Sequence, residues 1–297
     1  MNRKWNWITA AVFAATLPTL GGVASAQSQQ GSQPPPAQQQ GQQQTDKSKQ
    51  QPNPAPLTLD ATPPAAAASP EEEAAYKAFQ AVPATDKAKR TQSGEDFIKK
   101  YPESRYRAVI YSNLASVYFS SGQIDKLTDV ANKELALNPN DVSVMAIMAL
   151  TLSRTYKANA PDAAKQLDTA EQYAKKTIEL TPTLPKPDNL TDESFASAKA
   201  DTMEMAHSSL GLIYLHRGKA SDAIAELEDA VKVDRNPEPD PVNYYLLGLA
   251  NDSTSHFDAA AAAFAKCGAL QSTLQAQCQK NAEASKKKGA TQLSAPK

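Results

Sequence analysis

A large apolar residue followed directly by a small one recurs four times between residues 104 and 268. The four pairs are Leu114-Ala115, Met148-Ala149, Leu210-Gly211 and Leu247-Gly248. Two antiparallel helices approach closely only where one of them offers Gly or Ala, and a large neighbour fills the adjoining gap. The pattern therefore predicts a series of helix pairs with a close contact at the same place in each.

The second helix of each predicted pair carries its own packing residues at a regular distance. Its aligned residue lies 12 positions after the small residue of the first helix in the first, third and fourth pairs, and 21 positions after it in the second pair. The aligned positions are Tyr118 and Tyr214 in first helices, and Ala170, Ala223, Leu227, Ala230, Ala260 and Phe264 in second helices. Leu127, Glu134 and Thr177 depart from the pattern. Between successive first helices, the small residues Ala115 and Ala149 are 34 positions apart, and Gly211 and Gly248 are 37 positions apart.

This spacing resembles the tetratricopeptide repeat, a helix–turn–helix unit of 34 residues. The resemblance covers about residues 104–268, with insertions in the second and third units. The Trp that the family often shows early in the first helix is replaced here by Tyr111, Met145, His207 and Tyr244. The resemblance implies an all-α fold, in which antiparallel helix pairs stack into a right-handed α-solenoid.

Both ends of the chain differ in composition from the repeats. Residues 1–26 carry Arg3 and Lys4 before a short apolar run and end in Ala-Ser-Ala, which predicts a cleaved secretory signal. An uncleaved membrane anchor is the alternative. Residues 27–70 contain 12 Gln and 9 Pro and almost no large apolar side chains, which predicts a disordered linker over residues 27–69. We therefore expect an exported protein, periplasmic or secreted, with no membrane insertion after cleavage of the signal.

The helical domain is expected over residues 70–288, followed by a disordered tail at 289–297. Ser69-Pro70-Glu71-Glu72 predicts its first helix start, since Ser caps, Pro fits the first turn and Glu72 completes a capping box. The expected parts are a degenerate pair at 70–102, repeats at about 104–139, 141–182, 192–235 and 240–268, and a capping helix at 270–288.

The residues that usually carry chemistry are scattered, which favours a non-catalytic protein without cofactor or metal. His207, His216 and His256 show no metal-ligand spacing on one helix face. A formal net charge of −1 argues against a nucleic-acid binder. In an exported protein Cys267 and Cys278 are expected to form a disulfide that staples the capping helix, and two small buried thiols are the alternative.

The resemblance also implies where a partner binds, because the first helices of successive repeats line a concave face. Carried over to this chain, the groove would be formed by Ser112, Ser116, Phe119, Ala146, Leu150, Arg154, Ser208, Leu212, Leu215, Tyr245, Leu249 and Asp252. The expected function is a protein-interaction scaffold of the cell envelope that binds a protein or peptide there. The chain's own residues 70–82 or 182–203 could fill the groove instead. The alternative functions are self-association through the same apolar face and an accessory role to an envelope enzyme.

Overall fold

The computed structural model describes residues 68–188 and 190–294, and these form α-helices with one short 3-10 helix and no strand. The predicted signal at 1–26 and all but the last two residues of the predicted linker at 27–69 lie outside the described residues. The helices are α1 (Pro70–Gln80), α2 (Lys87–Lys100), α3 (Arg107–Ser121), α4 (Ile124–Leu137), α5 (Val142–Arg154), α6 (Ala163–Leu180), η1 (Thr181–Thr183), α7 (Asp192–His216), α8 (Ala220–Val233), α9 (Pro241–Ser253), α10 (Phe257–Ala269) and α11 (Gln275–Ser294).

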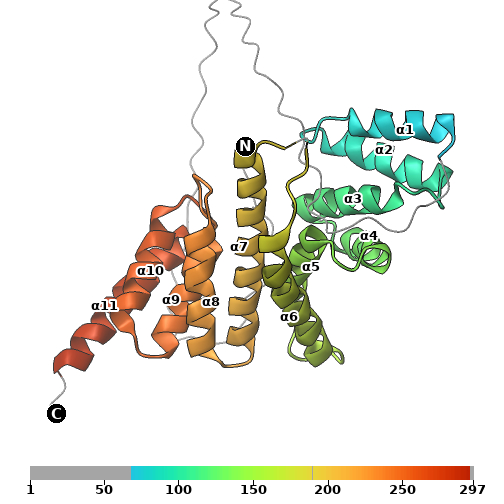
Figure 1. Cartoon of the computed structure of the whole chain (residues 1–297). Coiled ribbons are helices and arrows are strands. Elements are labelled where there is room, and N and C mark those ends of the chain that lie inside the picture. The colour runs from blue at the N-terminus through green and yellow to red at the C-terminus, as the bar shows by residue number, and fades with distance from the viewer. Residues whose placement is uncertain (1–67, 189, 295–297) are drawn as a thin grey trace, which may run out of the picture.

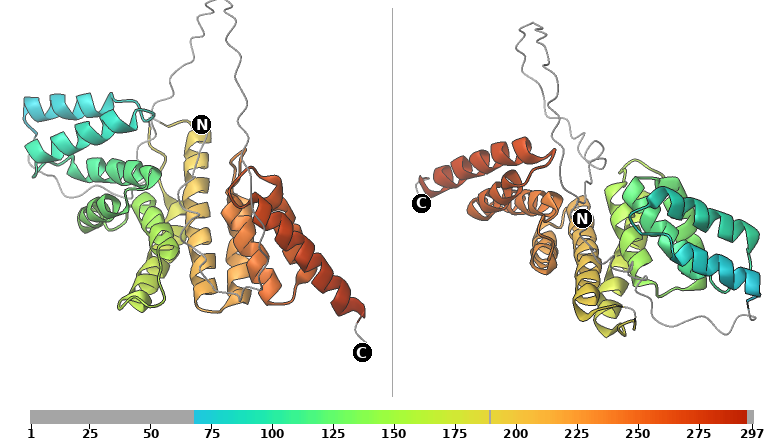
Figure 2. Two further views of the ribbon diagram at one scale, coloured as in Figure 1. Left: turned by 180° about the vertical axis from the view of Figure 1, so that it is seen from behind. Right: turned by 90° about the horizontal axis from the view of Figure 1, so that it is seen from above.

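The helices follow one another across the molecule in chain order, from α1 at one end to α11 at the other (Figure 1). Each helix packs on its sequence neighbour, and the first helices α3, α5 and α7 also pack on the next first helix in line. Seen from above, the row bends rather than running straight (Figure 2). The prediction of an all-α solenoid of stacked helix pairs is confirmed.

Close contacts inside the pairs explain the small residues of the repeat. A Cβ atom added at Gly211 of α7 would lie 2.4 Å from Leu227 Cγ of α8, and one at Gly248 of α9 would lie 2.6 Å from the Phe264 ring of α10. Real Cβ atoms do not approach so closely, and only glycine lets these helices meet at their present distance. The repeat-packing residues that the sequence singled out are buried, apart from the half-buried Tyr214.

The turns inside three of the pairs each contain one residue with a left-handed backbone conformation. Gly122, Gly218 and Ser255 stand seven positions after the small residues of α3, α7 and α9, and their φ angles are 72°, 70° and 64°. Left-handed backbone is free of strain only for glycine, so the serine is the exception in this set. The sequence analysis did not use this position, although its regular spacing is visible in the sequence.

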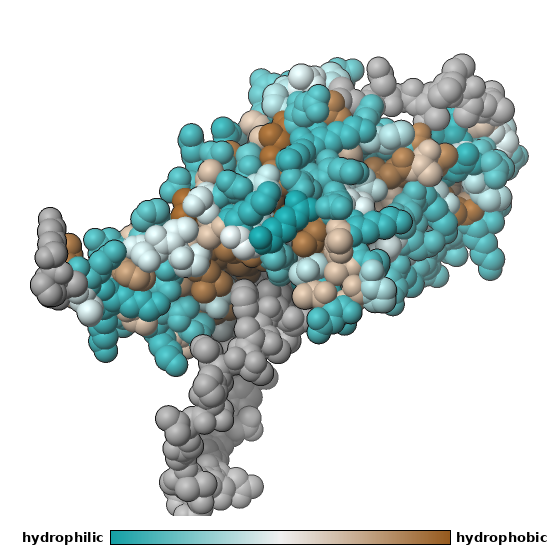
Figure 3. Space-filling model, turned by 90° about the horizontal axis from the view of Figure 1, so that it is seen from below, coloured by the Kyte–Doolittle hydropathy of each residue, from teal (hydrophilic) through white to brown (hydrophobic). Residues whose placement is uncertain are grey.

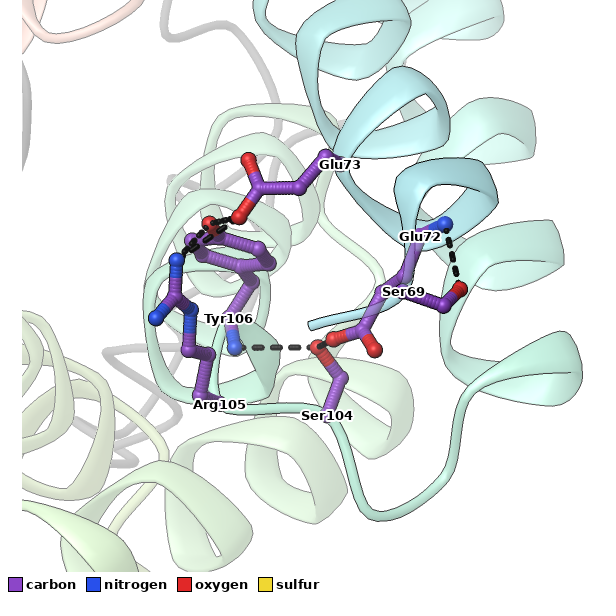
Figure 4. A network of polar contacts seen from close by, with 6 residues as sticks. All are labelled: Ser69, Glu72, Glu73, Ser104, Arg105 and Tyr106. Atoms are coloured by element: carbon purple, nitrogen blue, oxygen red, sulfur yellow. Dashed lines mark hydrogen bonds and ion pairs between the residues drawn. The ribbon is translucent and has the colours of Figure 1, made fainter. Parts of the chain in front are cut away.

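The N-terminal pair is attached by polar contacts from α1 to the segment before α3 (Figure 4). Ser69 Oγ caps α1 by accepting from the Glu72 backbone N–H at 3.1 Å. The Glu72 carboxylate does not complete the expected capping box; it accepts from Ser104 Oγ at 2.5 Å instead. Glu73 accepts from the Tyr106 hydroxyl and from Arg105, the latter at 2.7 Å. Residues 70–82 therefore dock on the end of the stack, away from the first helices of the later repeats.

The C-terminal boundary differs from the prediction. The capping helix begins at Gln275 rather than at residue 270 and continues to Ser294, so most of the expected tail is helical. Residues before Gln275 form a turn, because Leu270 is extended and the Leu274 backbone N–H donates to Ser272 Oγ. The helix continues past residue 288 because Gly289 lies against α10, where an added Cβ would be 3.5 Å from Phe257 Cβ. Across the part of the chain that the structure describes, no helix has both the length and the apolar character needed to span a bilayer.

Candidate interaction surface

The predicted groove residues do not form one open surface. Seven of the twelve are buried inside the stack: Ser112, Phe119, Ala146, Leu150, Arg154, Ser208 and Leu212. Leu212, for example, is 2% exposed and belongs to a core cluster with Leu227 and Leu246. The groove prediction is wrong for these seven, because neighbouring first helices pack against each other where the resemblance implied an open face.

An ion pair across the middle of the array helps to close this face. Arg154, at the end of α5, places Nη2 2.9 Å from Oδ2 of Asp240, which caps α9. The side chains are 5% and 26% exposed, so solvent screens the pair only partly. Asp240 also accepts through Oδ1 from the Val242 backbone N–H at 2.9 Å. The second and fourth helix pairs are therefore joined directly, over the first helix of the third pair.

The accessible part of the predicted groove lies on the C-terminal half. Leu215 at the end of α7 and Tyr245 and Leu249 on α9 are half-buried and pack on one apolar cluster. The Tyr245 ring lies 5.9 Å from the Phe264 ring, which holds it against α10. We call Leu215, Tyr245 and Leu249 the apolar strip. Figure 3 shows several separate brown apolar areas among teal areas on the side of the molecule seen from below.

The other two predicted groove residues have separate environments. Ser116 is exposed on α3, outside the apolar strip. Asp252 is occupied by the capping helix, because its carboxylate accepts from Ser285 Oγ at 3.0 Å and pairs with Lys288 at 2.5 Å. The strip is thus bordered at this end by a carboxylate that already has partners.

The histidines take part in packing and hydrogen bonds. His207 of α7 has Nδ1 2.7 Å from Glu226 Oε2 of α8. His216 lies beside the strip, with its ring centroid 4.6 Å from that of Tyr156 and Nε2 3.1 Å from the Ser153 carbonyl oxygen. Burial lowers the pKa of His216 below its usual value, which favours the neutral ring there. His256 is exposed in the α9–α10 turn.

Neither internal segment suggested as a groove filler covers the apolar strip. Residues 70–82 dock at the other end of the array, as described above. The insertion at 182–203 packs through Leu184 and Phe195 on Val142 and Met145 of α5, and its later part extends α7 backwards from the repeat. Among the residues described, the first helices themselves close the predicted groove.

Clustered catalytic groups are not apparent in the described residues. No group of three or more His, Cys, Asp or Glu side chains there could hold a metal ion. An open pocket of about 610 Å³ lies between the α9–α10 turn and the end of α11, with Phe257, Glu228 and Asp258 in its lining. Its lining also contains Ser221, Ser255 and His256, and His256 Nδ1 lies 3.1 Å from the Thr254 hydroxyl oxygen in the same turn.

The two cysteines lie at disulfide distance where the capping helix meets the last repeat. Cys267 of α10 and Cys278 of α11 have Cα atoms 5.7 Å apart, and both are fully buried. Gly268 lies in the same contact, where an added Cβ would be 2.9 Å from Gln279 Cγ. The predicted disulfide would therefore form at a close contact between α10 and α11.

Comparison with known proteins gives fold likenesses only. No protein-family model matches the sequence, and no curated protein matches it either. The chain is similar to a crystal structure of a tetratricopeptide-repeat protein from Thermus thermophilus, with 15% identity over 72% of this chain and 98% of that one and a TM-score of 0.45. It is also similar to a tetratricopeptide-repeat protein from Parabacteroides merdae, with 16% identity over 72% and 100% of the two chains and a TM-score of 0.29. The fold assignment rests on this chain's own helix pairs, whose regular close contacts and turns make it an α-solenoid of the tetratricopeptide type.

Proposed function

We propose that the protein is a non-catalytic scaffold of the cell envelope that holds a protein partner on the apolar strip. The observation that carries the proposal is that Leu215, Tyr245 and Leu249 stay half-buried on adjacent first helices, while the equivalent residues of the earlier helices are buried apart from Ser116 and the half-buried Asp252 of α9 lies next to the capping helix. Apolar side chains gathered on an accessible face commonly mark a contact surface. Tyrosine at the centre of such a patch is favourable for binding, because its ring is large and loses little conformational freedom.

The groups around the strip suit recognition of an apolar helix or extended peptide. The cluster beneath the strip is apolar, and the carboxylate of Asp252 at its end is already paired with Lys288. A partner is therefore expected to contribute apolar side chains here rather than a cluster of charges.

In-cell crosslinking tests the proposal at single residues. A photoreactive amino acid at position 249 should crosslink to a specific protein in intact cells, whereas the same group at exposed Glu179 on α6 should not. Fractionation of the cells and N-terminal sequencing of the mature chain test the envelope location, with Gln27 expected as the first residue. Equal crosslinking from positions 249 and 179, or none from either, would refute the interaction site.

Self-association through the same strip is the second candidate function. Light scattering of the purified chain over a range of concentrations separates the two. A dimer that is lost in Leu249→Asp, with crosslinks from position 249 only to a second copy, favours self-association. A monomer together with a crosslinked second protein favours the scaffold.

A further inference from the structure

Two carboxyl groups are buried together at the junction between the first and second helix pairs. Glu134 lies near the end of α4 and Asp141 caps the start of α5, and both are 0% exposed. Asp141 Oδ1 accepts from the backbone N–H groups of Ser143 and Val144, each at 3.0 Å. Glu134 occupies the repeat position that Ala230 occupies in the third pair. An acidic residue at this position is therefore not required by the packing of the repeat.

Among the residues that the structure describes, no ion pair joins a cation to either carboxyl. Lys133, which precedes Glu134 in α4, pairs with Asp129, and Lys176 of α6 donates to the Pro139 carbonyl oxygen at 2.8 Å, both at the surface. Within the described residues, no ordinary hydrogen bond reaches Oε1 or Oε2 of Glu134 or Oδ2 of Asp141.

The elements packed around the pair supply neutral groups. Ser112 of α3 interacts with Asp141, and Asn138 of the α4–α5 turn interacts with Glu134. The insertion and the start of α7 face this end of α5 with the apolar Leu184 and Phe195. Each carboxyl is therefore the main ionisable neighbour of the other.

Two like charges cannot both remain in such a site without a large free-energy cost. Burial, and then the Asp141 charge, raises the pKa of Glu134 to about 9. Burial also raises the pKa of Asp141, but Ser112 and the Val144 N–H oppose that rise by stabilising its carboxylate. At neutral pH the proton therefore belongs on Glu134 and the charge on Asp141, where the α5 N-terminus favours it.

We propose that Glu134 and Asp141 form a proton-dependent joint, in which one shared proton keeps α4 packed against α5. Loss of this proton to solvent base at alkaline pH leaves two buried negative charges and loosens the junction. The rest of the stack, which contains no such pair among its described residues, is expected to stay closed at the same pH.

The direction of the pH effect follows from proton linkage. In the folded chain burial keeps the pKa of Glu134 well above that of an ordinary glutamate, whereas unfolding returns the pKa to its ordinary value of 4.5. The stabilisation is fully present below the unfolded value and is lost as pH rises through the folded one. Between these limits, the unfolding constant should rise about tenfold per pH unit on account of this group.

Urea unfolding of the full chain tests the joint. Measurements at about pH 7.5, 8.25 and 9 cover the range in which linkage predicts a steady rise of the unfolding constant. We expect Glu134→Gln to remove the tenfold-per-unit rise, because Gln keeps the shape and the donor but has no proton to lose. The matched control Glu179→Gln, an exposed carboxamide on α6, should keep the wild-type slope.

Hydrogen exchange locates the effect within the chain. The protection factors of residues 134–145 should fall between pH 7.5 and 9 in the wild type but not in Glu134→Gln, and those of residues 257–267 should stay constant in both. Infrared spectroscopy gives a readout independent of folding, since the wild type at pH 7.5 should show a protonated-carboxyl band that Glu134→Gln lacks. Equal pH slopes in the wild type and Glu134→Gln, or absence of that band in the wild type, would overturn the proposal.

Discussion

Replacing Gly211 by alanine sets two opposed effects against each other in one helix. Alanine is favoured over glycine within a helix by about 1 kcal/mol. The added methyl group, however, would lie 2.4 Å from Cγ and 2.7 Å from Cδ2 of Leu227, which is itself fully buried. Overpacking of a well-filled core costs about 1–3 kcal/mol. The net expectation for Gly211→Ala is a loss of up to about 2 kcal/mol, where propensity alone predicts a gain.

A double-mutant cycle with Leu227→Ala separates these effects. Leu227→Ala alone should cost about 2–5 kcal/mol, because it leaves a cavity between α7 and α8. In that background the methyl group at position 211 enters free space, and Gly211→Ala should then stabilise by about 1 kcal/mol. The coupling free energy between the two sites is therefore expected at about 1–3 kcal/mol.

Urea unfolding followed by far-UV circular dichroism measures all four proteins. Ala225→Gly, at an exposed position of α8, calibrates the propensity effect in the same array and should cost about 1 kcal/mol. If Gly211→Ala stabilises the wild type and the Leu227→Ala variant equally, the helices do not meet at this glycine and the packing explanation of the repeat fails.

Three further predictions concern the capping helix, a turn and the apolar strip. Replacing Cys267 and Cys278 together by Ser should lower the free energy of unfolding by roughly 3 kcal/mol under oxidising conditions, measured by denaturant titration with the thiols of the parent counted by mass spectrometry. Ser255→Gly should raise the melting temperature, through about 1 kcal/mol of relieved backbone strain at its φ of 64°; calorimetry that shows a decrease contradicts this. Leu212→Asp should unfold the third and fourth pairs, because it places an unpaired charge in the core, whereas Leu249→Asp should abolish partner capture and leave most of the helicity; equal losses of helicity would place Leu249 in the core as well.

The helix pairs were predictable because their signal is local and repeated. Gly211 and Gly248 lie where the partner helix leaves no room for a larger side chain. This requirement involves only the two helices of one pair. The start of α7 at Asp192 was equally predictable, because its cap is local: Thr191 Oγ1 accepts from the Ser194 backbone N–H at 3.1 Å. The end of α11 at Ser294 was not predicted, because the contact of Gly289 with α10 is a tertiary feature that the sequence does not show.

The groove was only partly predictable, because repeat position tells which side of a helix faces inward but not how far the stack closes. Closure depends on contacts between residues far apart in the chain, of which Arg154 and Asp240 are the clearest, with 86 positions between them. The sequence analysis placed Arg154 in the open groove and Asp240 at the start of the fourth repeat, and it did not connect the two residues. Joined, the two bring the second and fourth pairs together over α7, which buries the groove at its centre. The groove residues that stay accessible are those beyond the closed part of the face. The position of the apolar strip on α7 and α9 therefore depends on the ion pair as well as on the repeat.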